Sequence, residues 1–133
     1  MSSPASALEV TAALAVDLVA SGSVEMGAHR PQDAAAIAAL LPAGTPVYVN
    51  HLPRHGLAQT LAALASVRAA GLEPVPHIAA RRVASRNELT EFLVKAVREA
   101  GISKVLLIGG DDPRPLGPYA DGLAVLRERI LAD

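Results

Sequence analysis

The chain of 133 residues lacks cysteine and tryptophan, and it contains only two tyrosines and one phenylalanine. The absence of cysteine excludes a disulfide scaffold, a zinc ribbon and a thiol nucleophile. The formal charge is −1, so the composition does not indicate nucleic acid or an anionic membrane as a partner. Charged residues interrupt every apolar run before about 20 residues, the length that spans a bilayer. The N-terminus also lacks the basic and apolar regions of a signal peptide, and we therefore expect a cytoplasmic protein.

The sequence is rich in the small residues alanine and glycine and poor in aromatic residues. Alanine accounts for 27 residues, a composition typical of helices that pack closely on thin strands. Four glycines, Gly22, Gly44, Gly71 and Gly101, each end a helical stretch and precede a short run rich in β-branched residues. Glycine is favoured just past a helix C-terminus because it adopts positive φ at no steric cost. The repeat predicts helix–strand units around a parallel sheet, in a single domain spanning residues 1–133.

The apolar spacing between these glycines predicts five helices and four strands in the order α(βα)4. The helices are expected around Leu8–Val19, Gln32–Leu41, Leu57–Leu64, Leu89–Ala96 and Tyr119–Leu131. Capping boxes that begin at Ser6 and Ser85 mark two of their starts. The strands are expected at Ser23–Met26, Thr45–Asn50, Leu72–His77 and Ile102–Ile108. In the first helix, Leu8, Ala12, Ala15, Val16 and Val19 form the side expected to face the core.

Two architectures of the α/β class fit this order of elements. One is a parallel (βα)4 half of a (βα)8 barrel with an extra N-terminal helix, because a full barrel needs roughly 250 residues. The other is a small open doubly wound sheet. Periodicity does not separate them, but strand order does: a sequential order indicates the barrel, and an inverted order indicates the doubly wound sheet.

In both architectures the functional edge lies at the carboxyl ends of the strands. Glu25 is expected there beside an apolar strand, where loss of water would suit a carboxyl group to general acid work. The alternative is a solvated or salt-bridged glutamate. Asn50, His51 and His77 follow the next two strands, and the alternative for His77 is a ring hydrogen-bonded to the backbone. The histidine spacing gives little support for a metal site.

The fourth strand end reads Gly109-Gly110-Asp111-Asp112. Two glycines allow a ligand to approach the backbone, and their N–H groups can hold anionic or carbonyl oxygens. A tight turn capped by aspartate is the alternative. Arg81, Arg82 and Arg86 share one loop, where they either clamp phosphates or carboxylates or are simply solvated.

Taken in order, these strand ends resemble the methylenetetrahydrofolate reductase family of flavin enzymes. The resemblance runs from about residue 22 to residue 133. The matching stretches are Ser23–Glu25, Pro46–Asn50, Gly71–Ile78, Gly101–Asp111 and Pro115–Leu126. The sequence departs from the family pattern at Gly109, where an arginine is common, and at Asn50, where a threonine is usual.

The resemblance implies a (βα)8 barrel that holds FAD at its mouth. There NAD(P)H reduces the flavin, which in turn reduces 5,10-methylenetetrahydrofolate to 5-methyltetrahydrofolate in one-carbon metabolism. Glu25 would supply the proton that opens the folate ring to a reactive iminium, and Asp111 would tune the flavin and hold the substrate. The residues implied at the FAD site are Asn50, His51, His77, Ile108, Gly109, Gly110, Asp111, Tyr119 and Ala120.

Four βα units correspond to only half of such a barrel, and they leave strand edges and an apolar face open. We therefore expect self-association, or a second chain that supplies the other strands, rather than a stable monomer. The alternative to the enzyme is a non-catalytic truncated paralogue, or an assembly subunit that binds folate or flavin. The sequence does not distinguish NADH from NADPH.

Overall fold

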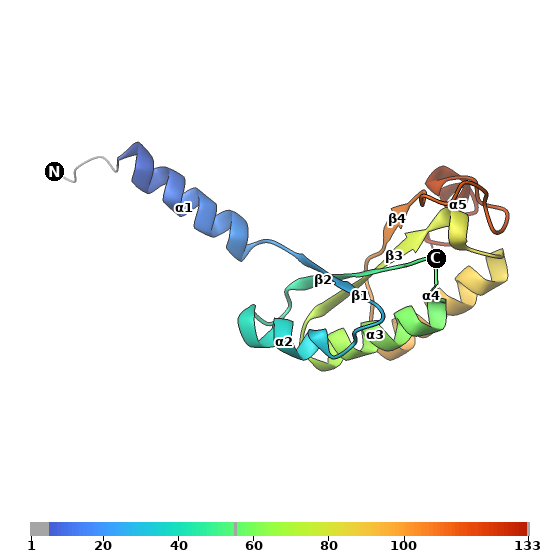
Figure 1. The fold of residues 1–133 in the computed structure, drawn as a ribbon, viewed down its shortest axis with the longest axis horizontal. Helices are drawn as coiled ribbons and strands as arrows, with labels where there is room; N and C mark the ends of the chain where they lie inside the picture. Colours follow the sequence, from blue (N-terminus) through green and yellow to red (C-terminus); the bar gives the residue numbers. More distant parts are fainter. Residues whose placement is uncertain (1–5, 55, 133) are drawn as a thin grey trace.

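The computed structural model describes residues 6–54 and 56–132. Helices and strands alternate through most of the chain (Figure 1). Their order is α1 (Ala7–Ala20), β1 (Val24–Gly27), α2 (Asp33–Leu40), β2 (Pro46–Asn50), α3 (Leu57–Ala69), β3 (Glu73–Ala79), the 3-10 turn η1 (Ala80–Arg82), α4 (Arg86–Ala100), β4 (Leu106–Ile108) and α5 (Gly122–Arg127). This confirms the α/β class and the expected order of elements.

The four strands form one parallel sheet in the order β1-β2-β3-β4. Helix α3 packs on β2 and β3 and contacts α2 and α4, and the three helices lie on one side of the sheet (Figure 1). A doubly wound sheet reverses its strand order and has helices on both faces. The sequential order is that of consecutive units of a (βα)8 barrel, so the described sheet has the arrangement of a half barrel.

The core lies between the sheet and the helices α2 to α4. Val47 and Val49 of β2 and Ile78 of β3 point to this side and are fully buried, as are Leu64 of α3 and Leu89 of α4. Successive side chains of a strand point to opposite faces, so the residues between these valines face the other side of the sheet. That helix-free side, here called the inner face, carries Glu25, Tyr48, Asn50, Val75, His77, Leu106 and Ile108.

Strand β4 is shorter than its apolar run predicts, and two prolines explain the difference. The Glu73 N–H donates to Thr45 of the segment that enters β2, so Pro74 and Pro76 direct their backbone toward β4. Proline has no N–H and contributes no donor to a ladder. Pairing between β3 and β4 therefore starts at His77 opposite Leu106, beyond both prolines.

The helix ends follow the sequence signals in part. Gly71 and Gly101, just after α3 and α4, have φ of 79° and 59°, the left-handed conformation expected after a helix. Gly44 also has positive φ but lies four residues after the end of α2, and Gly22 does not adopt positive φ. The capping box at Ser6 is complete, whereas at Ser85 the side chain caps α4 but Glu88 accepts from the Ala84 N–H instead. Helix α5 begins only at Gly122, because the Asp121 side chain caps it by accepting from the Ala124 N–H.

Helix α1 differs most from expectation. The side predicted to face the core is not buried, and none of the residues of α1 is buried. The helix extends away from the sheet, to which it is joined through residues 21–23 (Figure 1). The prediction of an inward face on α1 is therefore wrong for a single chain. Among the described residues, no helix has both the length and the apolar character needed to cross a membrane.

Arg68, in the last turn of α3, joins the C-terminal end of α4 to the start of β3. Its guanidinium donates to the carbonyl oxygens of Ala100, the last residue of α4, and of Gly101, each at 2.9 Å. It also donates to the Glu73 carboxylate of β3 at 2.9 Å. Hydrogen bonds from a charged donor are stronger than neutral ones, and these satisfy carbonyls at a helix end.

We predict that Arg68→Ala lowers the free energy of unfolding by about 2 kcal/mol, because a half-exposed charged donor to three acceptors is lost. Urea unfolding followed by circular dichroism measures the change. Lys95→Ala, at an exposed position on α4, is the control and should leave stability nearly unchanged. Equal effects of the two substitutions would show that Arg68 does not join these elements.

Candidate functional site

Three strands bring a polar cluster together on the inner face. The parallel register places Glu25 of β1 opposite Tyr48 of β2 and Gly27 opposite Asn50. Asn50 Nδ2 donates to Glu25 Oε1 at 3.2 Å, and its Oδ1 accepts from the Ala28 N–H at 3.4 Å. The amide of Asn50 thereby holds the Glu25 carboxyl group and the backbone after β1 at the same time.

His77 of β3 completes this inner-face cluster of Glu25, Tyr48, Asn50 and His77. Its Nε2 atom lies 4.0 Å from Glu25 Oε2, and its ring meets the Tyr48 ring edge-on at a centroid distance of 5.8 Å. Burial lowers the pKa of His77, and the Glu25 carboxylate opposes that shift. The imidazole is therefore disposed to be neutral near pH 7, with a carboxyl group beside it.

The Glu25 side chain is 57% exposed in the single chain. The expectation of a carboxyl group deprived of water by an apolar strand is therefore not met here. Glu25 lies on the edge strand β1, whereas Val75 and His77 on the same face of β3 are buried. Leu106 and Ile108 are exposed on the same face, at the end nearest Gly109. The inner face thus joins a carboxyl group, an imidazole and an uncovered apolar surface.

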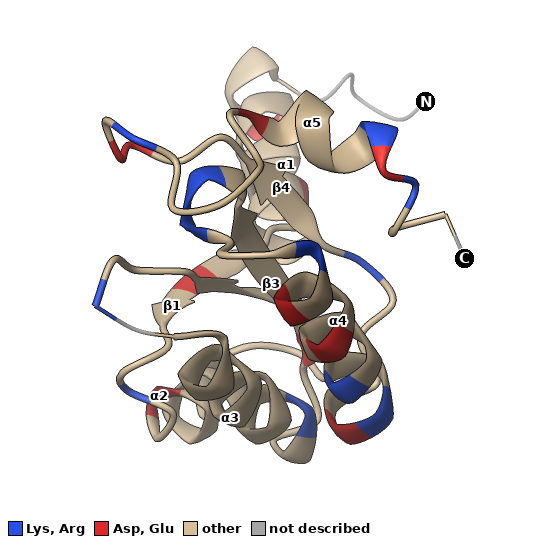
Figure 2. Ribbon diagram, turned by 90° about the vertical axis from the view of Figure 1, so that its right-hand side faces the viewer, with Lys and Arg blue, Asp and Glu red and all other residues tan. Residues whose placement is uncertain are grey.

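Arg81 and Arg82 of η1 hold the loop that follows β4. Figure 2 marks the positions of the basic and acidic residues along the ribbon. Arg81 donates to the backbone carbonyls of Asp112, Pro113 and Ala120, at 2.6, 2.8 and 2.9 Å. Arg82 donates to Asp112 Oδ2 at 2.7 Å and to the carbonyl of His51. The guanidinium groups of Arg81 and Arg82 are therefore occupied by the protein itself. Arg86, the third arginine of this segment, pairs with Glu128 at 2.8 Å on the surface.

The Gly109-Gly110 turn is anchored on one side and open on the other. The Gly109 carbonyl accepts from the Arg81 N–H at 2.9 Å, and Gly110 has a φ of 93°. A Cβ added at Gly110 would contact Ala79 and Arg81, whereas one added at Gly109 would meet no atom within 4 Å. The backbone at Gly109 is therefore approachable, as the sequence predicts for this pair of glycines.

A cavity lies next to η1, at the edge of the sheet where the strands end, here called the rim. Its volume is about 540 Å³, and it is bordered by His51, Arg54, Arg82, Asp112 and Arg114, among others. His51 is buried, and its Nδ1 has no hydrogen-bond partner among the described residues. Burial, and then the charge of Arg82, lower the pKa of His51, which Glu88 and Asp112 oppose. The exposed guanidinium groups here are those of Arg54 and Arg114.

The predicted site residues fall into two groups. Glu25, Asn50, His77 and Ile108 share the inner face, and Gly109, Gly110 and the exposed Asp111 continue from the end of β4. Three residues lie apart: the side chains of His51 and Tyr119 are buried, and the Ala120 carbonyl is held by Arg81. Within the described ranges, no hydrogen bond or ion pair joins Asp111 to the inner-face cluster.

Tyr48 is a cluster member that the sequence reasoning missed. The available signal was its position two residues before Asn50 in the same strand, which puts both side chains on one face. Tyr119 also differs from expectation, because it belongs to the hydrophobic core and burial raises the pKa of its phenol group.

Across residues 6–54 and 56–132, no group of three His, Asp or Glu side chains is placed to hold a metal ion. No known protein-family model matches the chain.

The lowered pKa values of His51 and His77 predict acid sensitivity. As pH falls through about 6.5, the unfolded chain takes up protons before the folded chain does, so the free energy of unfolding must decrease. We expect urea unfolding curves to show this loss between about pH 7.5 and pH 5. His51→Gln should reduce the slope, and His29→Gln, at an exposed position, is the control. A slope unaffected by His51→Gln would contradict the prediction.

Proposed function

We propose that this chain is one half of a flavin-dependent (βα)8 reductase of the methylenetetrahydrofolate reductase type. In the completed barrel it would use NAD(P)H to reduce 5,10-methylenetetrahydrofolate to 5-methyltetrahydrofolate. The observation that carries the proposal is the Glu25 carboxyl group, held by Asn50 and 4.0 Å from His77, on the helix-free face of a sequential parallel sheet. The sequence resemblance independently points to the same glutamate as the proton donor.

Glu25 would transfer a proton from Oε2, since Oε1 already accepts the Asn50 hydrogen bond. Asn50 therefore fixes the orientation of the carboxyl group toward the interior of the barrel. A substrate that covers this face would remove water from the carboxyl group and disfavour its charged form, which favours proton donation. Protonation of the folate opens its ring to an iminium, the form that accepts hydride. The Tyr48 and His77 rings would form an edge-on wall beside it.

The end of β4 fits the requirements of a flat cofactor ring. Gly109 is open to approach, Leu106 and Ile108 offer exposed apolar surface, and Asp111 is exposed next to them. A bound FAD supplies hydride transfer from the nicotinamide nucleotide to the folate. Asn50, His77, Ile108, Gly109, Gly110 and Asp111 are the residues we propose to hold it. The buried His51 and Tyr119 would act only by shaping the rim.

Completion of the barrel is part of the proposal. Within the described sheet, β1 and β4 each have a neighbour on one side only, and unpaired edges of this kind readily accept another strand. A second half, from another copy or another chain, would pair with both edges. It would also cover the inner face that Glu25, Leu106 and Ile108 now expose.

Retention of FAD is the first test. We expect the purified chain to keep a perturbed flavin absorption band through gel filtration. Gly109→Val should abolish retention without unfolding, because a side chain there meets no protein atom but fills the approach to the backbone. Gly56→Val is the matched control, since a Cβ at Gly56 also meets nothing within 4 Å. Equal flavin retention by both variants would place the flavin elsewhere. No retention by the wild type would favour the non-catalytic truncated paralogue.

The role of Glu25 is tested by separating the two half-reactions. In the completed barrel, Glu25→Gln should abolish folate reduction, because the amide has no acidic proton to give, and should leave flavin reduction by NAD(P)H intact. Stopped-flow absorbance measures each half-reaction. Glu91→Gln, on the exposed side of α4, is the control. If Glu25→Gln slows both half-reactions equally, Glu25 is not the proton donor.

A further inference from the structure

Helix α1 is an apolar helix without a partner in the single chain. Seven of its exposed positions are leucine, valine or threonine, and Leu8, Leu18 and Val19 are 83%, 74% and 78% exposed. A helix of 14 residues is marginal in water by itself and normally depends on packing of an apolar side. The capping box at Ser6 and Glu9 shows that the helix start is encoded locally. No surface that α1 contacts in the described chain buries it, so another surface is needed to cover the helix.

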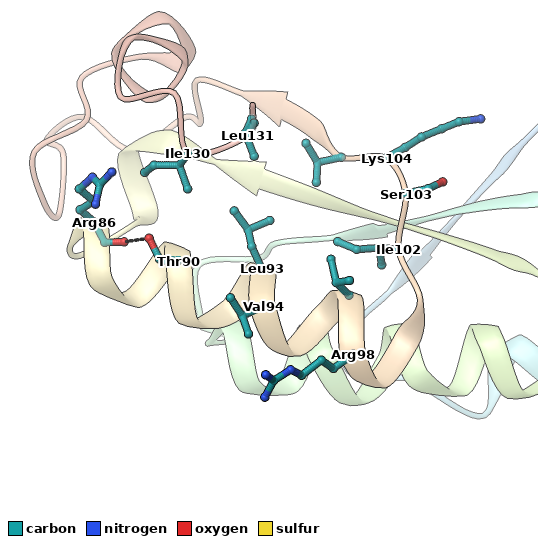
Figure 3. A pocket seen from close by; sticks show the side chains of 12 residues that line it. Arg86, Thr90, Leu93, Val94, Arg98, Ile102, Ser103, Lys104, Ile130 and Leu131 are labelled. Carbon is teal, nitrogen blue, oxygen red and sulfur yellow. Dashed lines mark hydrogen bonds between the residues drawn. The ribbon is translucent and has the colours of Figure 1, made fainter. Parts of the chain in front are cut away.

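A groove of about 590 Å³ lies beside α4, at the opposite edge of the sheet (Figure 3). Leu93 and Val97 of α4 form one wall, and Ile102, Val105 and Leu131 form much of the rest. In a series of parallel βα units, this position, next to the previous helix and outside the last strand, is where the next crossover helix packs. The groove thus has the position and the apolar lining required to hold a helix.

The charges of the helix and the groove are complementary. Helix α1 contains Glu9 and Asp17 and no basic residue. The groove is bordered by Arg86, which pairs with Glu128, and by Arg98 and Lys104, and its lining includes no acidic residue among those that the structure describes. Opposite charges across a contact favour encounter and fix orientation. An acidic, apolar helix is therefore the occupant that this basic, apolar groove favours.

A second copy supplies the helix for this groove more directly than the same chain does. Helix α1 leads into β1, and the groove lies beside the segment that enters β4, with β2 and β3 between them. Three strand spacings amount to about 14 Å. The four Cα–Cα steps from Ala20 to Val24 cover about 14 Å only when the connection is fully extended. In a second copy whose β1 pairs with β4, α1 reaches the groove without such an extended connection.

A two-fold axis parallel to the strands satisfies all these requirements together. It places β1 of the second copy beside β4, parallel to it, and so continues the sequential order into an eight-stranded barrel. The helix that runs into that β1 then approaches from the side of α4. This is the path that a crossover helix takes between neighbouring parallel strands.

We propose that the chain forms a two-fold homodimer in which α1 of each copy packs into the groove between α4 and residues 102–105 of the other. In this arrangement α1 of one copy lies beside α4 of the other, where β4 meets the first copy's β1, in addition to α5, which follows β4 within each chain. Asp17 and Arg98 represent the charged contacts across the interface. The inference rests on the barrel completion contained in the proposed function, but not on its flavin chemistry.

Light scattering after gel filtration of the full chain tests the proposal, and we expect the mass of a dimer. Arg98→Glu should weaken the dimer about tenfold, and Asp17→Arg should do the same, because each places like charges together. The double variant Asp17→Arg with Arg98→Glu should regain affinity. Lys95→Glu, on α4 but outside the groove lining, is the matched control. Circular dichroism establishes that each variant is folded.

A second measurement identifies which copy supplies the helix. Since the chain has no cysteine, Leu14→Cys and Val94→Cys can be introduced in separate copies and then mixed. We expect a disulfide-linked pair to form in the mixture far faster than in either variant alone. A monomeric wild type, a dimer insensitive to Arg98→Glu, or a cross-link within one doubly substituted chain would each overturn the proposal. Loss of flavin binding in an intact dimer would instead reject only the proposed function.

Discussion

The pairing of β3 with its two neighbours is the constraint on which the rest of the structure depends. Strand β3 is central in the sheet, with helix α3 packed on one side and the inner face on the other. Residues Pro74–Ala79 of β3 are all buried. Its register with β2 aligns Val75 with Tyr48. His77 follows two residues later on the same face, with its Nε2 atom 4.0 Å from Glu25 Oε2. Its prolines delay the pairing with β4 until His77. One strand thus determines both the cluster and the length of the last strand.

The same strand continues into η1, whose arginines determine the shape of the rim. Arg81 binds three backbone carbonyls of the segment after β4, and Arg82 joins Asp112 to the end of β2. A guanidinium group suits this task because its donors are fixed in one plane. The rim is therefore held by the protein itself, which leaves the approachable backbone at Gly109 and the exposed carboxyl group of Asp111 available to a ligand.

The proposed dimer would account for several features that look unfavourable in a single chain. Leu106 and Ile108 are exposed on the inner face, and none of the residues of α1 is buried. The groove beside α4 is lined by apolar residues and bordered by positive charge, the complement of α1. In the proposed dimer a second copy would cover each of these exposed apolar surfaces, and burying them would stabilise the pair.

The sequence by itself determined the order of elements and placed Glu25, Asn50 and His77 on three successive strands, because periodicity, capping residues and glycines act over a few neighbouring positions. It did not show that Glu25 and His77 lie within β1 and β3 rather than at their ends, or that α5 is only six residues long. Nor did it show that Tyr48 joins the cluster, that Arg81 and Arg82 bind groups of the protein itself, or that the apolar side of α1 faces away from its own core. These features depend on the register between strands and on distances between segments far apart in the chain. Only the tertiary structure decides them, because residue types alone do not specify which distant groups meet.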